Sequence, residues 1–61
     1  MLTDEQQKLI KFVFEGKTNT EIAENLGYSP NTVKKKLKYI YKFYKVENRK
    51  ELFLRAIDLE N

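Results

Sequence analysis

Apolar residues recur along this chain at spacings of three and four, the period of helices that bury one side. The first such segment opens with Thr3 as a good N-cap, and two acids, Asp4 and Glu5, follow where the helix dipole favours them. It ends near Glu15, with Gly16 as the residue that terminates it. The apolar stripe of this predicted core helix contains Leu2, Leu9 and Val13, flanked by Ile10, Phe12 and Phe14.

Two further helices are predicted on either side of Gly27. The short helix before it has polar capping residues at its start and three inner apolar residues, Ile22, Ala23 and Leu26. The helix after it begins with Ser29 and Pro30, a strong start signal because proline at the first helical position sacrifices no hydrogen bond. This second helix is expected to run from Pro30 to about Tyr44.

The helix over 30–44 has two chemically different sides. At about 100° per residue, one side gathers the apolar residues Val33, Leu37, Ile40 and Tyr44. The opposite arc carries Lys34, Lys38, Lys42 and Lys45, with Lys35 on its flank. We therefore expect one side to be buried and the other to be cationic.

A fourth helix is predicted from an N-cap at Asn48, over about 49–59. Its stripe of Leu52, Ala56 and Leu59 is expected to face the core. Three more apolar residues, Phe53, Leu54 and Ile57, remain as a surplus that is large for a monomer of this size. We expect this surplus to form the interface of a weak homodimer.

The composition of the chain excludes several kinds of site and activity. The chain of 61 residues has no cysteine and no histidine, which excludes disulfides and ordinary zinc sites, and we expect no metal or cofactor. No apolar run approaches the roughly 20 residues that a membrane span requires. Without histidine, cysteine or a glycine-rich phosphate loop, we expect no catalysis and no catalytic residues.

Charge is segregated along the chain. Residues 25–46 contain six lysines and no acid, which gives this segment a net charge of +6. The rest of the chain has six basic and nine acidic residues and a net charge of −3. A basic side on the second helix of a helix-turn-helix is the electrostatic footprint of a DNA-binding protein. The helix-turn-helix itself is indicated by the spacing of Ala23, Gly27 and Val33: a small residue at a close approach, a turn glycine, and an apolar residue packing the second helix onto the first.

Over nearly its whole length, the chain resembles the LuxR-type (GerE-like) helix-turn-helix domain of bacterial transcription regulators. The matching residues are Leu2-Thr3, Gly16, Asn19, Glu21-Ile22-Ala23, Leu26, Ser29, Thr32-Val33-Lys34, Val46 and Arg49. The chain departs from the family pattern at three places: Glu5-Gln6 stands for Arg-Glu, Lys36 for histidine or asparagine, and Phe43-Tyr44-Lys45 for Lys-Leu-Gly. The last departure indicates that the loop after residue 44 is entered without a glycine. The resemblance implies an all-α, compact four-helix domain, with 1–61 as a single domain.

The resemblance also assigns expected DNA contacts. Lys34, Lys35 and Lys38 lie where the family's recognition helix faces base edges, and lysine can donate to guanine O6 and N7. Free N–H groups and short polar side chains at two helix starts form ready phosphate sites, although ordinary capping also explains several of them. The expected phosphate-contacting residues are Thr18, Asn19, Thr20, Ser29, Asn31, Thr32, Lys36, Lys42 and Lys45.

We expect four aromatic residues to pack between helices rather than to stack on the bases of single-stranded nucleic acid. Tyr28, Tyr39, Tyr41 and Phe43 do not cluster on the lysine side, so we expect them to pack between helices. Tyr28 and Tyr41 are additional candidates for a hydrogen bond to phosphate at the rim.

The sequence therefore favours a sequence-specific, double-stranded DNA-binding transcription regulator with helix 30–44 in the major groove and helix 49–59 for dimerisation. Two alternatives stay open: a small antagonist that pairs with a full-length regulator, and a nonspecific DNA-binding protein. RNA polymerase is a further candidate partner, and we expect a cytoplasmic, nucleoid-associated protein of bacteria. The chain is either a stand-alone regulator or the output domain of a longer one.

Overall fold

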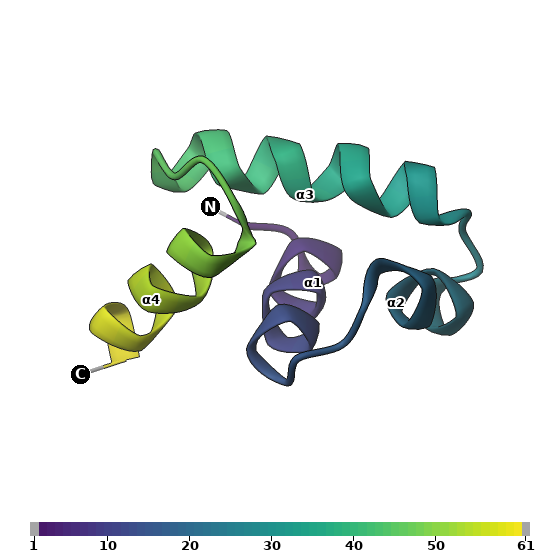
Figure 1. The fold of residues 1–61 in the computed structure, drawn as a ribbon, viewed down its shortest axis with the longest axis horizontal. Helices are drawn as coiled ribbons and strands as arrows, with labels where there is room; N and C mark the ends of the chain where they lie inside the picture. Colours follow the sequence, from purple (N-terminus) through teal and green to yellow (C-terminus); the bar gives the residue numbers. More distant parts are fainter. Residues whose placement is uncertain (1, 61) are drawn as a thin grey trace.

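The computed structural model describes the backbone of residues 2–60 and their side chains, except those at 56 and 58–60. Four helices follow one another: α1 (Asp4–Phe14), α2 (Asn19–Leu26), α3 (Pro30–Tyr44) and α4 (Arg49–Glu60). The long α3 spans one side of the molecule, and α1, α2 and α4 lie together against its other side (Figure 1). The fold is all-α and compact, with principal extents of 31 × 20 × 20 Å, as the sequence predicts.

Side-chain caps define where the helices begin. Thr3 and Thr18 each form a capping box with the residue three positions later, Gln6 and Glu21. Ser29 accepts a hydrogen bond from the N–H of Thr32 at 3.2 Å. At the start of α4, Asn48 Oδ1 accepts one from the N–H of Glu51 at 2.9 Å. The N-caps predicted at Thr3, Ser29 and Asn48 are confirmed, and Thr18 is the residue that caps α2, because these signals act within a few residues.

The helix ends follow from backbone conformation. Gly16 and Gly27 have φ of 79° and 75°, the left-handed region that glycine adopts without strain. At the end of α3, the residue in the left-handed conformation is Lys45, whose φ is 58°. The N–H of Val46 donates to the carbonyl of Tyr41 at 2.9 Å and closes the helix end. The loop is thus entered without a glycine, as expected, at a conformational cost that glycine would avoid.

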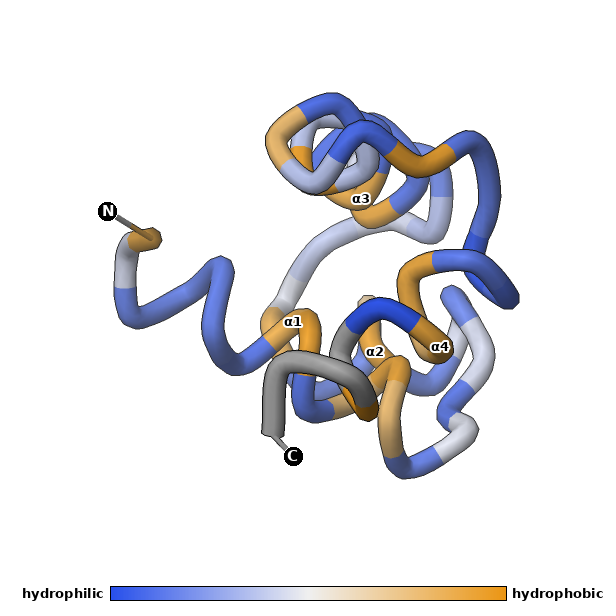
Figure 2. The backbone as a smooth tube through the Cα atoms, turned by 90° about the vertical axis from the view of Figure 1, so that its left-hand side faces the viewer, coloured by the Kyte–Doolittle hydropathy of each residue, from blue (hydrophilic) through white to orange (hydrophobic). Residues whose placement is uncertain are grey.

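All four helices contribute to one core. Apolar and polar segments alternate along the helices, as expected when each buries one side (Figure 2). The buried residues are Leu9, Val13, Ile22, Ala23, Val33, Leu37, Ile40 and Leu52. The predicted stripe of α3 is confirmed, with Tyr44 half-buried at its end. In α4, Leu52 faces the core as predicted, whereas the side chains of Ala56 and Leu59 lie outside the described residues.

The prediction that the aromatic residues pack between helices is wrong for two of them. Tyr39 and Phe43 are 63% and 51% exposed on α3. Both lie between the lysine side and the buried side of the helix, where no other helix covers them. Tyr41 does pack against the core, and Tyr28 is at the surface with its hydroxyl donating to Glu5. One additional aromatic contact joins Phe53 of α4 to Phe14 of α1, with ring centroids 5.1 Å apart.

Candidate nucleic-acid interface

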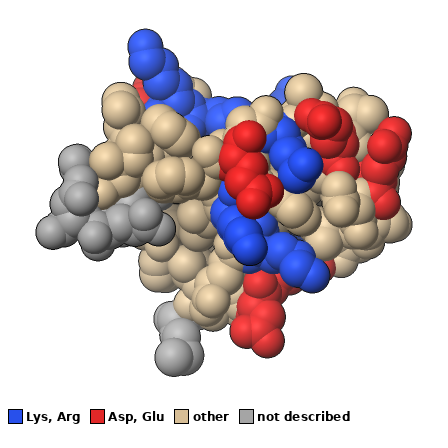
Figure 3. Space-filling view, turned by 90° about the horizontal axis from the view of Figure 1, so that it is seen from below, with Lys and Arg blue, Asp and Glu red and all other residues tan. Residues whose placement is uncertain are grey.

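The exposed side of α3 carries a cationic surface, which we call the lysine face. It consists of Lys34, Lys35, Lys38 and Lys42 of α3 and of Lys45, the residue that follows the helix, all of them exposed. Within the part of the chain that the structure describes, none of these five lysines forms an ion pair. The face turned away from α3, seen in Figure 3, mixes acidic with basic side chains. The segregation of charge in the sequence therefore becomes a segregation in space.

The starts of α2 and α3 carry the predicted phosphate-contacting residues. Thr18 Oγ1 accepts the N–H of Glu21 at 3.1 Å, and the Glu21 carboxylate accepts the N–H of Thr18 at 2.9 Å. The hydrogen bond from the Thr18 N–H to the carboxylate, followed by the effect of the Thr18 side chain, holds the pKa of Glu21 below its usual value. Ser29 Oγ lies 3.0 Å from Thr32 Oγ1. Thr18, Ser29 and Thr32 thus have capping roles, while Thr20 and Asn31 are exposed at the same helix ends.

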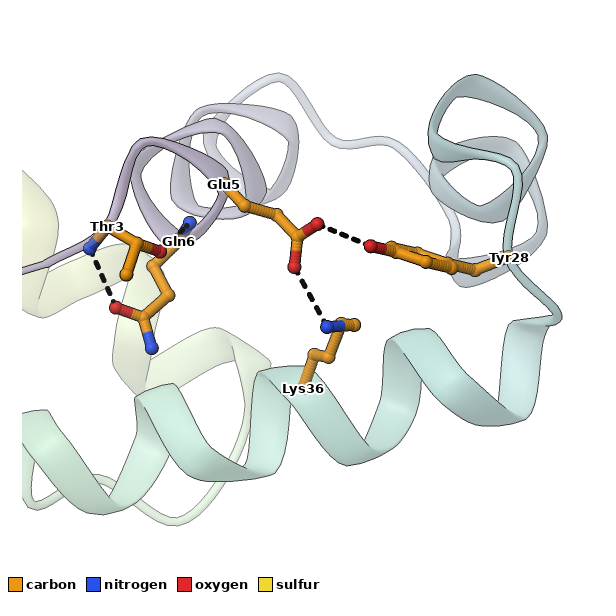
Figure 4. Close-up of polar contacts among 5 residues, drawn as sticks. All are labelled: Thr3, Glu5, Gln6, Tyr28 and Lys36. Carbon is orange, nitrogen blue, oxygen red and sulfur yellow. Dashed lines mark hydrogen bonds and ion pairs between the residues drawn. The ribbon is translucent and has the colours of Figure 1, made fainter.

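Lys36 faces away from the lysine face, towards α1. Its Nζ lies 2.9 Å from Glu5 Oε1 and 4.8 Å from the centre of the Tyr28 ring. The Tyr28 hydroxyl donates to the second oxygen of the same carboxylate (Figure 4). The hydrogen bond from Tyr28, followed by that from Lys36, holds the pKa of Glu5 below its usual value. The three side chains tie α1, the turn before α3, and α3 together.

A hollow of about 490 Å³ opens between the start of α2, α3 and the start of α4. Lys34, Leu37 and Tyr41 line it from α3, and Arg49 lines it from α4. The Arg49 guanidinium donates from Nη1 to Asn19 Oδ1 at 3.2 Å. Burial raises the pKa of the Tyr41 hydroxyl, so this group stays a hydrogen-bond donor at neutral pH. The hollow brings together residues that lie far apart in the sequence.

The three residues predicted for the interface on α4 differ in exposure. Leu54 is 52% exposed. Phe53 and Ile57 are half-buried, and the Phe53 ring rests on Phe14. Leu54 is therefore the best exposed of the three predicted interface residues.

Residues 1–56 match the family model of bacterial regulatory proteins, luxR family. No curated protein and no solved structure matches the chain. The chain belongs to the luxR family. It is accordingly a DNA-binding transcription regulator domain of the helix-turn-helix type. None of the helices in the described residues is long and apolar enough to cross a membrane.

The structure of this luxR-family domain places the predicted base-contacting residues together. Lys34, Lys35 and Lys38 lie on one exposed surface, and Lys42 and Lys45 extend it towards the end of α3. Lys36 is separated from them by its ion pair with Glu5. No group of three potential metal-ligating side chains occurs within residues described by the structure.

Two features of this luxR-family domain were missed in the sequence. The Glu5–Lys36 pair had a signal, because both residues depart from the family pattern and their charges are opposite. Arg49 was used only to recognise the family, although an arginine near the polar start of α2 is a candidate ligand for an anion. Both contacts bridge about 30 residues, so only the packing of the helices brings their partners together.

The Glu5 carboxylate is expected to make the stability of this luxR-family domain depend on pH. Its pKa is lowered in the folded protein, so its contribution is present above the ordinary glutamate value of 4.5 and is lost as pH falls through the folded pKa. Glu5→Gln should therefore lower the urea midpoint at pH 7, and the difference from the parent should shrink below pH 4.5. Glu24→Gln, at an exposed acid of α2, is the control and should leave the midpoint unchanged. If Glu5→Gln lowered the urea midpoint equally at pH 7 and below pH 4.5, the effect would not come from the charge of Glu5.

Proposed function

We propose that this domain binds double-stranded DNA sequence-specifically, with α3 in the major groove, and that residues 1–61 act as one domain. The observation that carries the proposal is the lysine face: four exposed lysines of α3 opposite its buried residues and Lys45 directly after the helix, without an acid among them. An α-helix fits the major groove, where the hydrogen-bonding pattern of each base pair is distinct. Lys34, Lys35 and Lys38 contact bases, and Lys42 and Lys45 contact phosphates.

The starts of α2 and α3 contact the phosphates on either side of the groove in this arrangement. Helix N-termini present free N–H groups and the positive end of the helix dipole to an anion. Asn19, Thr20, Asn31 and Thr32 contribute there alongside the capping residues Thr18 and Ser29. Lys36 contacts phosphate only by exchanging its ion pair with Glu5, which makes it the weakest contributor of the set.

The test is a titration with duplexes selected from a random pool, at about 50 mM salt. We expect tight binding to the selected site and weaker binding to unrelated duplexes. Absence of any binding would reject the proposal and favour the antagonist that pairs with a full-length regulator. Equal affinity for all duplexes would favour the nonspecific DNA-binding protein.

Alanine substitutions on the lysine face are expected to fall into two groups. Lys34→Ala or Lys38→Ala should cost about 1–3 kcal/mol on the selected site and relax the preference at one or two base pairs. Lys42→Ala or Lys45→Ala should weaken binding to all duplexes alike and lower the salt slope by about one. Binding isotherms at several salt concentrations separate the groups. The same response from all four variants would contradict the division between base and phosphate contacts.

We further propose that α4 joins two copies on a pseudo-palindromic site. A two-fold axis through the outer surface of α4 would place two α3 helices about 34 Å apart, one turn of DNA. The exposed Leu54 side chain supports this arrangement. The patch is smaller than a standard interface, so the dimer forms mainly on DNA.

Leu54→Glu is expected to abolish cooperative binding to two half-sites while the domain stays folded. A carboxylate in the apolar interface lacks a partner and repels its symmetry mate. Leu54→Gln should have a similar but weaker effect, which separates the interface from repulsion between glutamate and DNA. Ile57→Glu should act more weakly, and Phe53 is a poor probe because its ring packs on Phe14. Parent-like cooperativity in Leu54→Glu would place the dimer surface elsewhere.

A further inference from the structure

The guanidinium of Arg49 lacks part of the hydrogen bonds and the opposite charge that would stabilise it. One of its terminal nitrogens, Nη1, donates to Asn19 Oδ1 at 3.2 Å, whereas Nη2 is buried without a hydrogen-bond partner. No carboxylate of the described residues lies within ion-pair distance of the guanidinium. A cation taken partly out of water destabilises a protein unless an anion or further acceptors compensate it. Arg49 therefore has no anion in direct contact among the described residues, although the Glu21 carboxylate is near enough to interact with its charge.

The other groups lining the same hollow add positive charge and donors. The hollow includes the start of α2, the positive end of that helix dipole. The backbone N–H groups of Asn19 and Thr20 make no hydrogen bond to any described residue. Lys34 and Tyr41 line the hollow from α3, and the Tyr41 hydroxyl is near enough to interact with the charge of Arg49. Glu47 is the acid at its rim, and its exposed carboxylate does not pair with Arg49.

We infer that this hollow holds a backbone phosphate of the DNA, with Arg49 and Tyr41 as ligands beside the start of α2. Lys34 belongs both to the hollow and to the lysine face, so a strand lying along the lysine face passes the opening. The phosphate supplies the negative charge that the guanidinium lacks. Asn19 Oδ1 holds Arg49 at the end of α2 before DNA arrives. The inference rests on the proposed function. It adds Arg49 and Tyr41 to the DNA-binding residues proposed above, which are lysines of the lysine face and residues at helix starts.

Two substitutions test the hollow against one matched control. Tyr41→Phe removes a hydroxyl and keeps the packed ring, and Arg49→Gln removes the charge but keeps an amide near Asn19. Tyr44→Phe removes a hydroxyl from the core side of the same helix, outside the hollow and away from the lysine face, and serves as the control. A hydrogen bond to a charged group is substantial, so we expect a loss of affinity of about tenfold for Arg49→Gln. Tyr41→Phe should lose about threefold to tenfold, and Tyr44→Phe should stay within about twofold of the parent.

A scan with methylphosphonates, each making one backbone phosphate of the selected duplex neutral, identifies the ligand. We expect one position per half-site to weaken the parent by about tenfold and to cost the Arg49→Gln and Tyr41→Phe proteins little more, because the contact is already lost. Fully additive losses at every position, or parent-like binding by Tyr41→Phe, would overturn the inference. If Arg49→Gln lowers the melting temperature markedly, Tyr41→Phe decides the test alone.

The outcome also separates this inference from the proposed function. Duplex binding with additive losses overturns the phosphate site and leaves the proposed function standing, whereas absence of duplex binding overturns both. A titration with inorganic phosphate, followed by the amide signals of Asn19 and Thr20, distinguishes a free anion from the DNA backbone as the source. We expect weak shifts at millimolar phosphate that disappear in Arg49→Gln. Shifts saturating at micromolar phosphate would instead assign the hollow to a free anion.

Discussion

Val33→Asp is expected to unfold the domain, not merely to prevent DNA binding. Val33 is fully buried at the point where α3 packs onto α2. A carboxylate there has no partner, and burying an unpaired acid costs several kcal/mol. A domain of this size has a total stability of about the same magnitude, so the folded state should be lost. Circular dichroism should show no cooperative melting transition.

Lys35→Asp is the control for that experiment. It introduces the same acid into the first half of α3, but at an exposed position of the lysine face. We expect it to melt cooperatively near the parent temperature while binding DNA poorly. A native-like melt for Val33→Asp would mean that this valine does not hold α3 against α2.

The affinity for duplex DNA is expected to fall steeply with salt. If Lys42, Lys45 and Arg49 neutralise about three phosphates, the slope of log K against log salt is about −2.7. Affinity should then drop by about 40-fold between 50 and 200 mM salt for one domain, and further for a pair on DNA. Isotherms at four or more salt concentrations measure the slope directly.

The control is the same series with Lys8→Ala, whose lysine lies on α1, outside the lysine face. Its slope should match that of the parent. A slope near zero for the parent would show that phosphates contribute little, which contradicts a binding surface built on Lys34 to Lys45.

The helices were predictable because their signals are local. Ser29-Pro30, Gly16 and Gly27 act on the neighbouring backbone whatever surrounds them, and the structure has helix ends there. The buried side of α3 followed from periodicity, since one apolar stripe on a long helix can face only one core.

The exposed aromatics and the long-range contacts were not predictable in this way. Tyr39 and Phe43 flank the apolar stripe of α3, and whether a flanking residue is covered depends on how far α1 and α4 reach across it. The partnerships of Arg49 with Asn19 and of Lys36 with Glu5 depend on the angles between helices, which periodicity does not determine. The residues of the candidate DNA surface were therefore predictable. That Lys36 pairs with Glu5 and that Arg49 lines a hollow beside the lysine face were not.

If DNA occupies the lysine face as proposed, the two sides of α3 link the lifetime of the protein to the occupancy of its DNA sites. Val33, Leu37 and Ile40 of this helix are buried in the core that all four helices share, while its other side carries the lysine face. DNA on that face binds only the folded chain, so free DNA at one hundred times its dissociation constant adds about 2.7 kcal/mol to stability. In a domain this small, that increment is a large fraction of the total. Proteases cleave the unfolded chain, so we expect copies without DNA to be degraded faster and the cellular amount of the regulator to follow the number of sites it occupies.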